Sequence, residues 1–307
     1  MVNKKLLFLG IFLLMISGVL AVSLTYFGQI TSTVNVNRAL TVTGGNCNEA
    51  GVCTETLPGI AGGESVTSEV YTINSQTSVN APIQISTSVD PSEEGIATNI
   101  EYSLFAQGDP AGSESRIFIR GEDVGVFTLN DLNTISWDTN AILGYLPHID
   151  VLIDTDGDGI KDDALVFEYA KATVANCDNS PYPTGNLTTF YDKGNISEAT
   201  YAWLTTGDAG PCSGSPTFFW HSLADWKAGQ TNQNGKNING ATPVKGFDLE
   251  VDSWIEESSA RVSGILINGN AVDITIKPAG TLDFYTVTNF DVDSYGEYEL
   301  TTTVTPQ

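Results

Sequence analysis

The residues that most clearly could bind an ion or take part in a reaction are closely spaced aspartates near the middle of the chain. They follow the pattern D-x-D-x-D-G, in which carboxylates recur at every second position before a glycine. Calcium binds six to eight oxygen atoms at about 2.3–2.6 Å, and a short loop with this spacing can wrap around the ion. We therefore predict a calcium site. Its predicted ligands are Asp154, Asp156, Asp158, the backbone carbonyl of Ile160, Asp162 and Asp163.

The segments on either side of these aspartates, 149–153 and 164–169, alternate as strands do. Position 12 of the loop is Leu165, where an EF-hand has a bidentate glutamate. The loop therefore resembles the short calcium loops of dockerins and thrombospondin repeats, set on a β-hairpin, with Asp163 or Glu168 completing the shell. The alternative is a solvated acidic turn without metal, in which the carboxylates repel one another. The predicted role of calcium is structural.

Residue patterns typical of enzymes are missing from this sequence. The chain has two histidines, and neither lies in an H-E-x-x-H zinc motif. There is no G-x-S-x-G nucleophile motif and no Walker loop. His148 follows Pro147 and is expected at a strand end. Carboxylate pairs for glycoside hydrolysis stay open, because their separation depends on the fold. We predict that the protein is not an enzyme.

Two further patterns suggest binding without catalysis. One is a group of aromatic residues that could stack on sugars, although such side chains more often fill a core. These are Trp203, Phe218, Phe219, Trp220, Trp226 and Trp254. The other is Asp248, Glu250 and Asp252, which alternate along a predicted strand and so share one face. That face is either exposed to solvent or a second cation site, and we expect solvent.

Four cysteines and two glycosylation sequons are typical of an exported chain. An even cysteine count in such a chain predicts disulfides. The simplest of three pairings joins Cys47 to Cys53 and Cys177 to Cys212. A zinc site is disfavoured because no C-x-x-C pattern is present. The sequons at Asn186 and Asn195 fall in the long segment that the second disulfide would close.

The amino-terminal segment also indicates export. Lys4 and Lys5 precede an apolar stretch that ends in small residues at Ala21, so residues 1–21 are predicted to be a secretory signal peptide. The alternative is an uncleaved membrane anchor, since no charge appears between Lys5 and Arg38. In either case the remainder is expected to be extracellular or on the cell surface.

The charge of the chain limits its partners. The net charge of −24 results from 37 acidic and 13 basic residues. Such a surface repels nucleic acid, whose phosphates are neutralised by lysine and arginine, so we predict no nucleic-acid binding. It suits high salt or divalent cations, or it serves solubility alone.

Alternation of apolar and polar residues dominates the chain and predicts strands. The clearest runs are 22–42, 83–86, 274–276 and 298–304. Asn268-Gly269 predicts a tight hairpin, and short helices are predicted only at 195–204 and 219–228. The predicted fold class is all-β, an antiparallel β-sandwich of jelly-roll or Greek-key type with a β-rich inserted region.

The composition changes along the chain and suggests an order of segments. We predict that residues 22–37 form an N-terminal extended segment. Residues 38–125 and 271–307 are predicted to form a discontinuous sandwich. Residues 126–270, which are rich in aromatic residues and aspartate, are predicted to be an inserted β-rich calcium-binding domain.

Two flanking segments of the chain have a recognisable pattern. One is AVSLTYFGQITSTVNVN at 21–37, leading to ALTV at 39–42, and the other runs from Pro278 to GEYELTTTV. Both flanks resemble camelysin and TasA-like secreted proteins. The resemblance implies a β-sandwich subunit of extracellular fibres, as in bacterial matrix and archaeal pili or cannulae. It also implies that the mature amino end can insert as a strand into a neighbouring subunit. The inserted region is similar to jelly-roll modules of archaeal surface proteins.

These observations together predict a structural function. Segment 22–36 is uncharged and alternating, as strand addition to a sheet edge requires, although it could instead be an edge strand of its own domain. We expect an exported, calcium-stabilised protein that self-associates into an extracellular filament or surface layer. The alternative is a surface adhesin or carbohydrate-binding module with glycans as ligands. A membrane is a partner only if the amino-terminal segment stays uncleaved.

Overall fold

The computed structural model describes the chain from residue 40 onward, with gaps. The described residues are 40–60, 63–78, 80, 81–90, 92, 96–108, 113–144, 146–167, 191–206, 220–231, 235–253, 257–276, 280–290 and 296–306. The predicted signal peptide and the segment 22–37 lie outside this part. No helix in the described part is long and apolar enough to cross a membrane.

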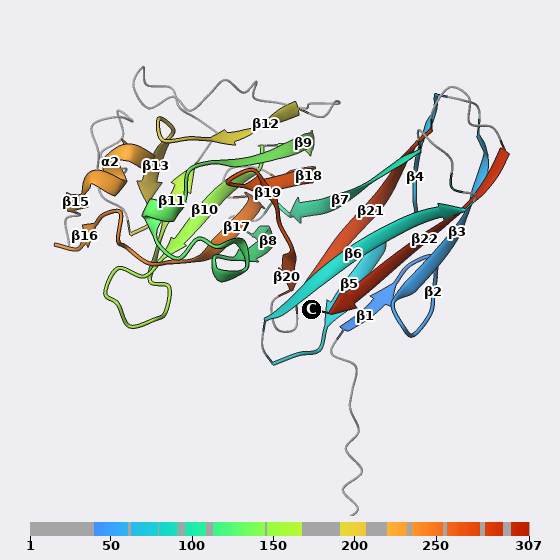
Figure 1. Ribbon diagram of the computed structural model, residues 1–307, viewed down its shortest axis with the longest axis horizontal. Coiled ribbons are helices and arrows are strands. Elements are labelled where there is room, and N and C mark those ends of the chain that lie inside the picture. Colours follow the sequence, from blue (N-terminus) through green and yellow to red (C-terminus); the bar gives the residue numbers. More distant parts are fainter. Residues whose placement is uncertain are drawn as a thin grey trace, which may run out of the picture. The chain divides into compact units, whose positions relative to one another are not determined.

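Two antiparallel sheets contain nearly all the strands (Figure 1), which confirms the predicted all-β sandwich. The first sheet has the order β1 (Leu40–Thr43), β5 (Tyr71–Ser75), β21 (Thr281–Asn289), β7 (Ala97–Ala106), β18 (Ser258–Ile267), β9 (Ile135–Leu143) and β12 (Tyr191–Ile196). Two short strands join it, β4 (Ser65–Thr67) beside β21 and β19 (Asn270–Ala271) beside β18.

The second sheet is longer and lies against the first. Its order is β14 (Trp220–Ser222), β13 (Tyr201–Leu204), β11 (Asp163–Phe167), β10 (His148–Ile153), β17 (Val244–Asp252), β8 (Glu114–Arg120), β20 (Ile274–Ile276), β6 (Ala81–Asp90), β22 (Gly296–Pro306), β3 (Val52–Ile60) and β2 (Asn46–Cys47). The remaining elements are the pair β15 (Gln230–Thr231) and β16 (Asn237–Ile238), the 3₁₀ helices η1 (Glu122–Val124) and η2 (Leu129–Asp131), and the helix α2 (Leu223–Ala228).

The core between the sheets follows from the period-two alternation of the sequence. Successive side chains of a strand point to opposite faces, so one set enters the core. In β22, Tyr298, Leu300, Thr302 and Val304 are buried, as predicted. The Thr302 hydroxyl lies 3.2 Å from that of Thr286 on β21, so these two polar groups satisfy each other inside the core.

Apart from the separate pair β15 and β16, the described strands of 126–270 belong to the same two sheets as the flanking strands. β18 pairs with β7 of the first sheet, and β17 pairs with β8 of the second. Ala39–Gln307 accordingly forms one compact unit. Both sheets therefore continue across the positions near 126 and 270 where the sequence suggested boundaries.

Local sequence signals explain the turns and the short helix. Asn268 and Gly269 have φ of 52° and 77° and join β18 to β19, as the hairpin prediction requires. Ser222 caps α2 by accepting a hydrogen bond from the Asp225 amide at 3.1 Å, so a helix forms within the predicted 219–228. The helix predicted at 195–204 is wrong: the end of β12 and all of β13 lie there, because both segments join sheets.

A disulfide joins Cys47 to Cys53 across the β2–β3 hairpin, as predicted. A crosslink over a sequence separation of six residues restricts the unfolded chain, and the loop-entropy relation gives about 2 kcal/mol. We expect Cys47→Ala, Cys53→Ala and the double variant each to lose about this amount of unfolding free energy in denaturant titrations. Losses that add up in the double variant would contradict a shared covalent bond.

The carboxylate of Asp131 holds the turn that leads into η2. It accepts hydrogen bonds from the Thr128 amide at 2.8 Å, the Thr128 hydroxyl at 2.9 Å and the Phe127 amide at 3.1 Å. The Thr128 amide and hydroxyl lower the pKa of Asp131, and Lys227 acts in the same direction, against a smaller opposing effect of desolvation.

This lowered pKa predicts how stability depends on pH. Because the folded-state pKa lies below the unfolded value of about 3.9, the contribution is complete above that value and lost as pH falls through the folded pKa. We expect Asp131→Asn to be less stable than wild type at pH 6 and the difference to shrink toward about pH 2. A difference that is constant with pH would contradict the role of the charge.

Candidate metal centre

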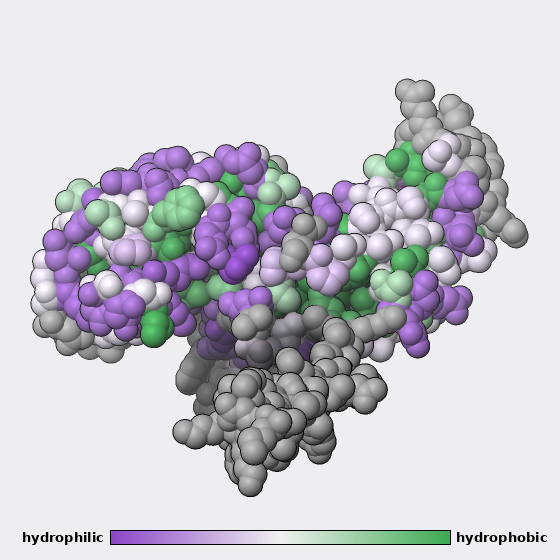
Figure 2. Space-filling view, turned by 60° about the horizontal axis from the view of Figure 1, so that its bottom comes forward, coloured by the Kyte–Doolittle hydropathy of each residue, from purple (hydrophilic) through white to green (hydrophobic). Residues whose placement is uncertain are grey.

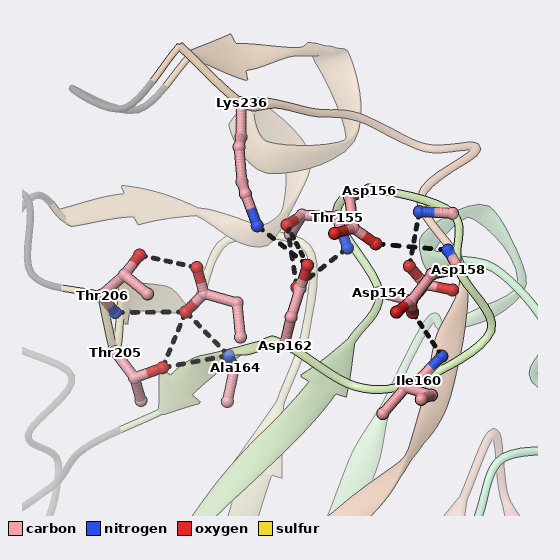
Figure 3. A network of polar contacts seen from close by, with 12 residues as sticks. Asp154, Thr155, Asp156, Asp158, Ile160, Asp162, Ala164, Thr205, Thr206 and Lys236 are labelled. Carbon is pink, nitrogen blue, oxygen red and sulfur yellow. Dashed lines mark hydrogen bonds and ion pairs between the residues drawn. The ribbon is translucent and has the colours of Figure 1, made fainter.

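The predicted calcium loop connects β10 to β11 in the second sheet (Figure 3), on the β-hairpin that the sequence predicted. The hairpin closes at the pair Ile153 and Asp163, and the Asp162 amide donates to the Ile153 carbonyl at 3.0 Å. The Asp154 amide donates to the Pro243 carbonyl at 3.1 Å, at the start of β17. The loop is therefore fixed to three neighbouring strands.

Asp154 lies at the centre of the loop and is almost completely buried. Its two carboxylate oxygens accept hydrogen bonds from the Gly157 amide at 2.6 Å and the Gly159 amide at 2.9 Å. Lys245 of β17 places its Nζ 3.3 Å from Oδ2. Burial alone would raise the pKa of Asp154, but these amides and the ammonium together lower it, so the carboxylate is charged.

The backbone curls around Asp154 because two glycines adopt left-handed conformations. Gly157 and Gly159 have φ of 80° and 92°, which side chains with a Cβ rarely adopt. Asp156 accepts from the Asp158 amide at 3.2 Å, and Asp158 accepts from the Ile160 amide at 2.8 Å. These local hydrogen bonds fix the conformation of the loop around Asp154.

Three of the predicted ligands come together. Carboxylate oxygens of Asp154, Asp156 and Asp162 all lie within 4.8 Å of one another. Two oxygens bound to one calcium at about 2.4 Å lie at most about 4.8 Å apart, so this set fits the ion. Calcium would be bound by these hard oxygen donors, with further oxygens from the loop or from water.

Lysine ammonium groups also contact this oxygen set. Lys236 donates to Asp162 at 2.8 Å, and the Thr155 amide and hydroxyl donate to the same carboxylate at 3.0 and 2.8 Å. Burial opposes ionisation of Asp162, yet these donors lower its pKa. The bond to Asp162 correspondingly raises the pKa of Lys236. A bound cation would compete with Lys236 and Lys245 for the same oxygens.

The side chains of the other predicted ligands lie outside this group of three carboxylates. The Asp163 carboxylate turns toward β13, where it accepts from the Thr205 hydroxyl at 2.7 Å and the Thr206 amide and hydroxyl at 3.1 and 2.6 Å. Figure 3 shows Thr205 and Thr206 on the opposite side of Asp162 from Asp154. Asp158 is not one of the three grouped carboxylates, and the side chain of Ile160 is exposed. Glu168 lies outside the described residues.

Sequence reasoning missed the cations and the hydroxyl that hold the loop. Lys236, Lys245 and Thr155 contact the aspartates, and the two lysines come from segments distant in the sequence. Thr155 sits inside the motif, where a short hydroxyl side chain beside Asp156 could have been recognised as an internal donor. The lysines have no such signal: Lys245 reaches the loop through the pairing of β10 with β17, and Lys236 reaches it from the segment just before β16.

The remaining predicted sites are distributed along the chain. Cys177, Cys212 and Asn186 lie outside the described residues. Asn195 is exposed on β12, at the edge of the first sheet, where a glycan would have room. Trp226 is completely buried and donates from Nε1 to the Ala202 carbonyl at 3.1 Å, so it belongs to the core.

The expectation that Asp248 and Glu250 face solvent is wrong. Only 1% of Asp248 and 4% of Glu250 is exposed. They do share one face of β17, as the alternation predicted, but this side of the second sheet is covered. Alternation identifies a common face, whereas burial depends on what packs over that face.

A cavity of about 440 Å³ lies where β7, β8, β20 and β21 meet. Its lining includes Phe105, Glu114, Arg116, Phe118, Thr275 and Asp283. The Thr275 hydroxyl is buried and has no hydrogen-bond partner in the described part of the chain. The volume is within the range of small-molecule sites.

The described residues form an all-β sandwich with an acidic hairpin loop whose grouped carboxylates suit a hard cation. The Cys47–Cys53 disulfide is compatible with an extracellular location. No family model, no curated protein and no solved structure matches this chain.

Proposed function

We propose that this chain is an exported, calcium-stabilised structural subunit that joins copies of itself into an extracellular filament or surface layer. The joining element is segment 22–36, which adds as a strand to the sheet edge of a neighbouring subunit. Calcium in the Asp154–Asp162 loop stabilises the subunit, and the polymer forms outside the cell.

The observation that carries this proposal is the position of β1. The uncharged, alternating segment 22–36 leads almost directly into β1, which forms one edge of the first sheet. Within the described residues, β1 pairs only with β5, so its other side offers backbone donors and acceptors. Such an edge accepts an added strand, and head-to-tail addition produces an open filament.

The charge of the protein supports a role for divalent cations in assembly. A net charge of −24 causes repulsion between copies. Figure 2 shows hydrophilic residues over much of one face, with hydrophobic areas between them. A calcium ion in the loop would neutralise two negative charges of each subunit and hold together the ends of β10 and β11, which the loop connects.

Negative-stain microscopy of the purified mature protein tests the proposal directly. At micromolar concentration we expect fibres or sheets with millimolar calcium and dispersed particles after chelation. Dispersed particles under both conditions, with the protein folded by circular dichroism, would contradict a structural-subunit function.

The cavity between β7 and β8 favours a second candidate, a surface module that binds polyhydroxylated ligands. Phe105 is more than half exposed there, and Glu114, Asp283 and the buried Thr275 hydroxyl supply polar groups. In this case the protein stays monomeric and binds glycans as ligands. Saturation-transfer NMR with oligosaccharides tests this second function: saturation transfer should be observed with the wild type and lost in Phe105→Ala.

A further inference from the structure

A group of metal-ligating side chains, two of them buried and Asp150 partly exposed, lies on β10 and β17, apart from the aspartate loop. The imidazole of His148 and the carboxylates of Asp150 and Glu250 place one ligand atom each within 4.8 Å of the other two. The pairing of β10 with β17 sets His148 directly opposite Glu250, and Asp150 lies two residues along the same face. We propose that these three residues bind a first-row divalent metal ion of the zinc type.

The distances between the three donors fit a shared ion. His148 Nε2 lies 3.3 Å from Glu250 Oε1 and 3.8 Å from Asp150 Oδ1. Charge-assisted hydrogen bonds are shorter, about 2.7–2.9 Å. Zinc binds nitrogen and carboxylate oxygen at about 2.0–2.2 Å, so two ligands of a tetrahedral site lie about 3.4 Å apart. The separation of 3.3 Å matches the edge of such a tetrahedron, and Asp150 would move closer to His148 on binding the ion.

Further charged groups lie on the same face. Besides Asp150 and Glu250, the buried Asp248 and the exposed Glu114 are acidic, and Arg116 of β8 forms ion pairs with Asp248, Glu250 and Glu114. Arg116 lies 3.1 Å from Asp248 and 3.4 Å from Glu250. A divalent ion bound by the neutral imidazole would add positive charge beside these carboxylates, and burial makes such charge favourable.

The donor types select the class of metal. One imidazole nitrogen with two carboxylates suits zinc and its first-row neighbours, whereas the aspartate loop has oxygen donors alone and suits calcium. Three protein ligands leave one position of a tetrahedral site for water. The ion would cross-link β10 to β17 on the side of the second sheet opposite the core.

The two histidines of the chain provide a matched pair of variants for the test. With millimolar calcium present to saturate the aspartate loop, zinc is titrated calorimetrically into the mature wild-type protein. We expect one equivalent to bind and the affinity to fall roughly 10–100-fold in His148→Gln and in Glu250→Gln. His221 contacts Trp226 edge-on and is not in the group, so His221→Gln should bind zinc as wild type does. Equal binding by His148→Gln and wild type would overturn the proposal.

A second measurement observes the wild-type protein and uses a variant only for assignment, so its result does not depend on folding of a variant of the site. In ¹⁵N-histidine-labelled wild type, only two imidazoles report, and zinc should shift the Nε2 resonance of one of them to a metal-bound value. His221→Gln assigns that resonance to His148. A His148 imidazolium that is unchanged by millimolar zinc would show an ion pair with Glu250 alone and would overturn the proposal. Neither measurement depends on fibre formation.

Discussion

Removal of residues 22–36 is expected to abolish assembly while leaving the subunit folded. The described core begins at β1, and Ala39–Gln307 forms a compact unit separate from Met1–Arg38, so the unfolding transition should change little. Without the segment no strand is available for a neighbouring sheet edge, and fibres should disappear from negative-stain images at any calcium concentration. Size-exclusion chromatography should then give a monomer.

Single substitutions sharpen this prediction, because the two faces of a strand differ in burial. Ile30 and Val34 belong to the apolar set of the alternation, and Thr31 and Thr33 to the polar set. We expect Ile30→Asp or Val34→Asp to prevent assembly, because a charge would enter an apolar groove. Thr31→Asp or Thr33→Asp should still form fibres. Normal fibres from the deletion variant would rule out donation by this segment.

Replacement of Asp154 by asparagine is expected to lower the affinity for calcium roughly 100-fold. Asp154 is the buried centre of the loop and one of the three grouped carboxylates. Calcium at 100 times its Kd stabilises a protein by about 2.7 kcal/mol, or about 5 °C in melting temperature for a chain of this size. That gain should be present in wild type and absent from Asp154→Asn, as measured by calorimetry with and without chelator.

Asp162 and Asp163 provide the matched control for the calcium site. They are neighbours in the sequence, but only Asp162 belongs to the grouped carboxylates, whereas Asp163 binds Thr205 and Thr206. We expect Asp162→Asn to weaken calcium binding, and Asp163→Asn to keep calcium affinity while lowering stability in its absence. Equal calcium affinity in wild type, Asp154→Asn and Asp162→Asn would mean that the loop is a metal-free acidic turn.

Much of the fold could be predicted because it depends on local alternation. Residues such as Tyr298, Leu300 and Val304 lie two apart, and in an extended chain that spacing alone puts them on one face. The Asn268-Gly269 turn is equally local, since both residues tolerate positive φ. The prediction of a helix at 195–204 failed because pairing with neighbouring strands outweighed a weak helical pattern.

The sequence by itself determined the strand pattern, the hairpin loop with its glycines and aspartates, and the cysteine pair six residues apart. These features depend on residues close together in the chain, where spacing dictates geometry. The tertiary structure alone decided which aspartates share a point, how Lys236 and Lys245 reach them, and that Glu250 is buried opposite His148. Those contacts arise from the pairing of distant strands and from what covers each face, and neither is encoded in local spacing.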